Sequence, residues 1–73
     1  MSNTEINIGQ RVKNQRLSKG MTIKVLSEIT GLSVGHISEI ENGIKSNLQQ
    51  KTILKLSHGL KMSVTELLGV DEE

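Results

Sequence analysis

The chain has 73 residues without Cys, Phe, Tyr or Trp, which excludes disulfide bonds, thiolate catalysis, cysteine zinc sites and the aromatic stacking platforms of most RNA-binding proteins. A chain of this length has room for a single domain, which buries only about 60% of the surface that the unfolded chain exposes. Three of its eight carboxylates form an acidic tail at 71–73, so nine cations and five carboxylates give residues 1–70 a net charge of +4.

Single glycines separate short segments with helical spacing of apolar residues, and this pattern predicts an all-α domain over residues 1–70. The first helix is expected over Ile8–Ser18, because Ile8, Val12 and Arg16 fall on one stripe. Gly20 is expected to stop it.

A second helix is expected to begin at Thr22, a good N-cap residue, and to end at Gly31, which suits a left-handed C-cap. Its buried face should contain Leu26, Ile29 and Thr30. Because Gly31 ends it, this helix is expected to have little more than two turns.

A third helix is expected over Ser33–Asn42, with Ser33 as its N-cap. Helical spacing places four residues on its inner face, namely Ile37, Ile40, Glu41 and Ile44. The side that faces water then consists of Gly35, Ser38, Glu39 and Asn42.

The fourth helix is expected to begin between Ser46 and Gln49, because Ser46-x-x-Gln49 and Asn47-x-x-Gln50 both fit a capping box, and the pattern does not choose between them. Its apolar stripe is predicted to contain Ile53, Leu54, Leu56 and Leu60. The fifth helix is predicted to start with a capping box over Ser63–Glu66, with Met62 and Leu67 as a hydrophobic staple, and to end at Leu68.

The second and third helices are joined only by Gly31, Leu32 and Ser33, which is too short for an antiparallel hairpin, so they should cross at a steep angle. Ser27 supplies the small residue that such a crossing needs, and Gly31 is expected to have a positive φ. The wedge between the helices is predicted to be filled by Leu26, Leu32, Ile37 and Ile40.

These positions lie within three segments, IGQRVKNQRLSKGMT, LSEITGLSVGHISEIENG and ILKLSHGLKMSVTELL, which cover most of the chain from Ile8 to Leu68. In them the chain resembles the helix-turn-helix DNA-binding domains of phage Cro and repressor proteins, the XRE family, and it is also similar to small Gram-positive repressors. The resemblance implies a compact five-helix fold of the lambda-repressor type. It also implies a homodimer that binds an inverted repeat in duplex DNA as a transcriptional regulator, expected to be a repressor.

The same resemblance implies that the helix from Ser33 to Asn42 enters the major groove while the helix from Thr22 to Thr30 crosses the phosphate backbone. The implied base-reading residues are Val34, Gly35, His36, Ser38 and Glu39. The implied phosphate contacts are Thr22, Lys24, Ser33, Lys45, Ser46 and Asn47. Ile23 stands where relatives often carry a Gln that contacts phosphate, and Leu48 replaces a frequent Pro, so the affinity of one subunit is expected to be modest.

Arg16 and Glu41 each place a charge on an otherwise apolar stripe, and the resemblance implies that they pair inside the domain. Either charge buried alone would cost about 3 to 5 kcal/mol. Relatives often pair through the fifth helix, which makes a dimer patch of Met62, Val64, Leu68 and Val70 a second expectation, whereas Leu60 and Leu67 are expected to belong to the core.

The alternative function is a protein-interaction module, such as an anti-repressor or a regulator's partner, that has kept the fold but not DNA binding. An enzyme is not expected, because His36, His58 and the scattered Ser residues form no recognisable nucleophile and base pair. No cofactor, metal or membrane partner is predicted, and a protein antagonist or co-regulator is considered. The absence of a signal peptide pattern leads us to expect a cytoplasmic, nucleoid-associated protein.

Overall fold

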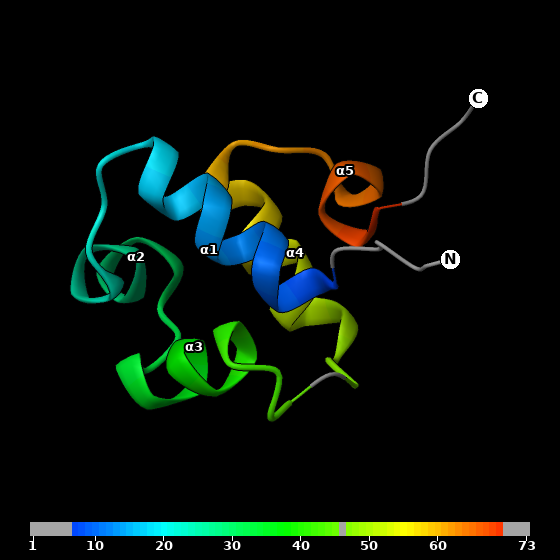
Figure 1. Ribbon diagram of the computed structural model, residues 1–73, viewed down its shortest axis with the longest axis horizontal. Coiled ribbons are helices and arrows are strands. Elements are labelled where there is room, and N and C mark those ends of the chain that lie inside the picture. The colour runs from blue at the N-terminus through cyan, green and yellow to red at the C-terminus, as the bar shows by residue number, and fades with distance from the viewer. Residues whose placement is uncertain (1–6, 46, 70–73) are drawn as a thin grey trace.

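Five helices make up the computed structural model, which describes residues 7–45 and 47–69. They are α1 (Ile8–Ser18), α2 (Ile23–Thr30), α3 (Val34–Glu41), α4 (Gln50–Leu60) and α5 (Val64–Leu68). The described residues contain no strand, so the predicted all-α five-helix fold is confirmed. Figure 1 shows α1 in front of α4 at the centre, with α2 and α3 toward one end and α5 toward the other. Helix α1 packs on α3, α4 and α5, and α2 packs on α3 and α4.

Local capping interactions set most of the helix starts. The hydroxyls of Thr22, Ser33 and Ser63 accept hydrogen bonds from the backbone N–H groups of Val25, His36 and Glu66. The Glu66 carboxylate in turn accepts from the Ser63 amide at 2.9 Å, which completes the predicted capping box. Asn7, which was not predicted as a cap, accepts from the Gln10 amide at the start of α1 in the same way. Each of these side chains satisfies an amide that the helix itself leaves without a partner.

The core is entirely aliphatic. Its buried members come from every helix and from the α2–α3 turn: Val12, Leu26, Leu32, Ile37, Ile40, Leu56, Leu60 and Leu67. The four residues expected in the wedge between α2 and α3 are among them, and so are Leu60 and Leu67. Met62 packs against this core, as expected for a staple residue next to Leu67.

Helix α4 starts at the C-terminal end of the predicted range, with Gln49 as its N-cap. Gln49 makes no side-chain capping bond, so neither of the two proposed capping boxes supplies the N-cap. The inner face of α4 contains Thr52, Leu56 and Leu60. Leu54 follows Thr52 by two residues, a rotation of about 200°, which turns it away from the core. Leu54 is accordingly 49% exposed and does not belong to the buried stripe.

Two other apolar residues were also wrongly expected to be inside. Ile29 is 55% exposed, because the face that α2 packs on α3 and α4 buries Leu26 and Thr30 and leaves Ile29 at the margin. Ile44 is exposed because α3 ends at Glu41 with Asn42 as its C-cap, so the helical spacing no longer applies three residues later. Both errors extend a correct periodic face beyond the packing that covers it.

A close contact between α1 and α3 fixes the position of the third helix. A Cβ atom added at Gly9 would overlap the backbone carbonyl of Ile40 and lie 3.2 Å from that of Glu41. The absence of a side chain at Gly9 therefore allows the start of α1 to approach the end of α3 directly.

Candidate nucleic-acid interface

The turn between α2 and α3 is held by side chains from α2. Gly31 has φ 81°, as predicted for this position. The Ser27 hydroxyl donates to the Leu32 carbonyl at 2.6 Å. The Thr30 hydroxyl donates to the Leu26 carbonyl at 2.8 Å and accepts from the Leu32 amide at 3.2 Å. These bonds satisfy the backbone groups of the buried residue Leu32 and fix the orientation of α3 relative to α2.

Helix α3 has one buried and one open face. Ile37 and Ile40 are fully buried, whereas Val34 is 47% exposed and Gly35 and Glu39 are also exposed. His36 and Ser38 are half-buried. The five predicted base-reading residues therefore lie together along the outer side and edges of a helix whose inner side is anchored in the core.

Asn42 restricts one of these residues. Its Nδ2 atom donates to the Ser38 carbonyl at 2.9 Å and to the Ser38 hydroxyl at 3.3 Å. The Ser38 hydroxyl thus already accepts a hydrogen bond, and its own proton remains to be donated outward. Asn42 was expected on the solvent side of the helix, and its contact with Ser38 was not predicted.

Arg16 and Glu41 form the expected ion pair in a nearly buried position. Nε of Arg16 donates to Oε2 of Glu41 at 2.7 Å, and Nη2 donates to Oε1 at 2.9 Å. The two side chains are only 9% and 4% exposed. The hydrogen bond to Glu41 raises the pKa of the Arg16 guanidinium against the lowering effect of burial. The pair joins α1 to the end of α3, so both charges act on structure.

A third bond extends this connection to the α1–α2 turn. Nη1 of Arg16 donates to the backbone carbonyl of Met21 at 2.8 Å. One guanidinium thereby contacts α1, α3 and the segment that leads into α2. Such a forked set of donors suits the planar geometry of arginine.

The predicted phosphate contacts lie at helix ends and in the segment after α3. Thr22 and Ser33 are the exposed N-caps of α2 and α3, and their hydroxyls already accept the amides of Val25 and His36. The exposed residues Lys24, Lys45 and Asn47 are the other described members of this set. Ser46 lies outside the described residues. The open N-termini of two helices favour negative charge through their aligned peptide dipoles.

The predicted dimer patch has members with different environments. Leu68 is exposed on α5, and Val64 and Met62 are half-buried. Val70 lies outside the described residues, as does the acidic tail at 71–73.

No helix in the described segments is long and apolar enough to cross a membrane. The described residues also contain no cluster of three or more potential metal ligands.

Residues 12–67 match a family model described as helix-turn-helix. The chain belongs to the helix-turn-helix family. It is 35% identical over 66 residues to the HTH-type transcriptional regulator SinR of Bacillus licheniformis, covering 90% of this chain and 60% of that protein. The chain therefore spans less than two thirds of that relative's length.

Two solved structures show the likeness in three dimensions. One is SinR, the master regulator for biofilm formation, in complex with DNA, with a TM-score of 0.80 and 36% identity over 84% of this chain and 97% of that chain. The other is the P22 c2 repressor in complex with a synthetic operator, with a TM-score of 0.81 and 26% identity over 89% of this chain and 97% of that chain. The five-helix arrangement is thus shared with DNA-bound proteins.

Proposed function

We propose that this chain is a sequence-specific DNA-binding transcriptional regulator that represses from an inverted repeat as a dimer. The observation that carries the proposal is the open outer face of α3, which is anchored by Ile37 and Ile40 but covered by no other described element. B-DNA has a major groove about 12 Å wide, which admits one α-helix. The likeness to the DNA-bound forms of SinR and the P22 repressor supports the same use of this helix.

The outer residues of α3 offer different contacts to base edges. Val34 suits the methyl group of thymine, and an N–H of His36 suits N7 of a purine. The Ser38 proton is available for an acceptor because Asn42 occupies its oxygen as a donor. The Glu39 carboxylate accepts from N4 of cytosine, and it also disfavours sites where it would face a phosphate.

The flanking helix ends supply the contacts that position α3. In this arrangement the first-turn amides of α2 and α3, together with Thr22 and Ser33, face the phosphates. Lys24 in the first turn of α2 and Lys45 and Asn47 after the end of α3 are exposed and are proposed to add sequence-independent affinity. Ser46 remains a further expected contact. These groups fix the register of the helix on the duplex, whereas sequence is read by α3 itself.

The dimer is proposed to form through the patch of Met62, Val64, Leu68 and Val70. Among the described members of that set, Leu68 is an exposed aliphatic residue. A two-fold interface there would place two copies of α3 on half-sites about one helical turn of DNA apart. A sedimentation mass equal to one chain across the micromolar range, with and without DNA, would contradict this pairing.

Selection of bound sequences from random duplex DNA tests the proposal directly. We expect an enriched palindrome whose affinity falls steeply with salt, because phosphate contacts release counterions. His36→Ala should cost about 1 to 3 kcal/mol of binding free energy and relax the preference at one base position. Lys45→Ala should weaken binding to all DNA sequences uniformly and reduce the slope of log affinity against log salt by about 1. Lys13→Ala, on the exposed side of α1, is the matched control. Equal binding to the palindrome and to scrambled duplex would contradict sequence-specific binding, and absence of any salt-dependent complex with DNA would favour the protein-interaction alternative.

A further inference from the structure

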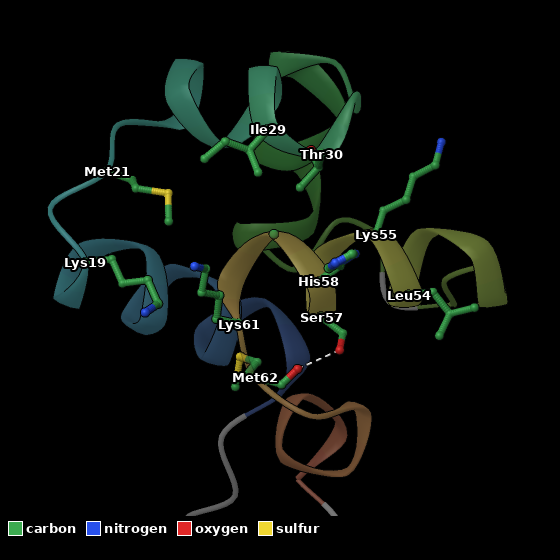
Figure 2. Close-up of a pocket in the computed structure, with 11 residues that line it drawn as sticks. Lys19, Met21, Ile29, Thr30, Leu54, Lys55, Ser57, His58, Lys61 and Met62 are labelled. Atoms are coloured by element: carbon green, nitrogen blue, oxygen red, sulfur yellow. Dashed lines mark hydrogen bonds between the residues drawn. The ribbon is translucent and has the colours of Figure 1, made fainter.

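A second surface of the molecule remains unused by the proposed DNA contacts. A groove of about 1250 Å³ runs between α2, α4 and the α1–α2 turn. Its apolar lining includes Met21, Ile29, Leu54 and Met62. Figure 2 shows Lys19 and Met21 toward one end, Leu54 toward the other, and Ile29 above α4. Ile29 and Leu54 are two of the three exposed residues that periodicity wrongly placed in the core, and both line this groove.

The charges around this groove all have one sign. Lys19, Lys55 and Lys61 line it together with His58. Among the residues that the structure describes, no Asp or Glu lines the groove. The chain as a whole is nearly neutral, with a formal charge of +1. An occupant that complements this surface must therefore combine apolar side chains with carboxylates.

The size and shape of the groove favour a helix over a small molecule. Pockets for small ligands usually have volumes of about 300 to 1,000 Å³ and enclose most of the ligand, whereas this groove is larger and lies open along α4. Leu54 and His58 are spaced at i and i+4 on α4 and both line the groove, and Lys61, the C-cap of the helix, lines it just beyond the helix end. An amphipathic helix laid along these residues contacts them with residues at helical spacing.

DNA is not the expected occupant. No described residue of α3 contributes to the groove, whose lining comes from α2, α4 and their neighbouring turns. The exposed aliphatic side chains of Ile29 and Leu54 would gain nothing from a phosphate backbone. A segment of protein with apolar and acidic side chains would bury these two residues and also pair with the lysines.

A second copy of this chain does not supply a suitable helix from its described residues. Helices α1 and α4 carry no carboxylate, and α2 carries Glu28 alone. On α3, Glu41 is already paired with Arg16 and leaves only Glu39. Glu66 on α5 is used in the capping box. We propose that the groove is the docking site for an amphipathic helix of another protein, with its apolar stripe flanked by Asp or Glu residues.

The test uses a defined peptide rather than an unknown partner. The probe is an amphipathic peptide of about 18 residues, with Leu at helical spacing and Glu on both flanks. One comparison peptide keeps the Leu residues and replaces every Glu with Lys, and a second scrambles the Glu peptide. Each is titrated into the ¹⁵N-labelled full chain and followed through backbone amide shifts. We expect the Glu peptide alone to shift amides of Met21, Ile29, Leu54 and His58.

Two groove variants and two matched controls sharpen the result. Leu54→Ser should weaken the affinity for the Glu peptide about tenfold, since an aliphatic side chain is lost from the contact. Lys55→Glu should weaken it about fivefold and should reduce its salt dependence. Leu17→Ser and Lys13→Glu change an exposed leucine and an exposed lysine outside the lining, and they should leave the affinity unchanged. All four positions are exposed, so circular dichroism should show intact helices in every variant.

Several outcomes would overturn the docking proposal. They are equal binding of the Glu and Lys peptides, absence of binding by the Glu peptide, shifts located on α3, or equal losses in the groove variants and their controls. A dimer in sedimentation that Leu54→Ser converts to monomer would assign the groove to a second copy and would also refute the proposal. DNA binding is measured separately, because the docking proposal does not depend on it.

Discussion

The Arg16–Glu41 pair offers the sharpest test of how α3 is held. Glu41→Leu removes two hydrogen bonds of 2.7 and 2.9 Å and leaves a guanidinium that is 9% exposed with the Met21 carbonyl as its remaining acceptor within the pair's network. Leaving one partner of a buried pair costs about 3 to 5 kcal/mol. A domain of this size has a total stability of about 4 to 11 kcal/mol, so the variant should be marginally folded.

A double variant distinguishes loss of the ion pair from the cost of burying one charge without its partner. Arg16→Met with Glu41→Leu replaces both charges by apolar side chains of similar length, and such replacements are often neutral or stabilising. We expect the double variant to recover at least 2 kcal/mol relative to Glu41→Leu, a strongly non-additive cycle. Urea unfolding followed by circular dichroism at 222 nm is the suitable assay, because the chain has no Trp or Tyr for fluorescence. A loss below 1 kcal/mol for Glu41→Leu, or additive effects, would refute the structural role of the pair.

Three further predictions concern packing and backbone conformation, and urea unfolding checks each. Gly9→Ala should destabilise by about 1 to 3 kcal/mol through overlap with the Ile40 carbonyl, whereas Gly35→Ala, with open space around its Cα, should not destabilise; equal effects would contradict the close approach. Lys61→Gly should stabilise by about 0.5 to 1 kcal/mol because Lys61 has φ 56°, and a loss of stability would show that the left-handed cap is not strained. Leu56→Ala should lower the free energy of unfolding by about 2 to 5 kcal/mol and Leu54→Ala by less than about 0.5 kcal/mol. Similar losses for the two variants would show that Leu54 is buried in the core.

The features that depend on local sequence were predictable. Thr22, Ser33 and Ser63 act as N-caps because the hydroxyl and the amide it accepts are only three residues apart. Ile37 and Ile40 were correctly assigned to the core because the short α2–α3 turn allows few ways of packing the two helices. The same tight turn carried the resemblance to helix-turn-helix domains.

Features that depend on contacts between distant segments could not be predicted in the same way. Periodicity places Ile29 beside the core residues of α2, but it does not show which neighbouring helix covers that face. The approach of Gly9 to the Ile40 carbonyl joins α1 to α3 across the domain, and a single glycine inside a helix gives no signal for it. The candidate capping boxes before α4 place the N-cap at Ser46 or Asn47, whereas the helix begins at Gln50 with Gln49 as its N-cap.

The bond from Arg16 to the Met21 carbonyl has a consequence for communication between the two surfaces. Met21 lines the groove, and the same guanidinium holds Glu41 at the end of α3. A ligand that displaces the turn around Met21 would therefore act on the orientation of α3 through one side chain. Because linkage is reciprocal, if groove occupancy changes the affinity for DNA by some factor, bound DNA must change the affinity for the groove ligand by the same factor.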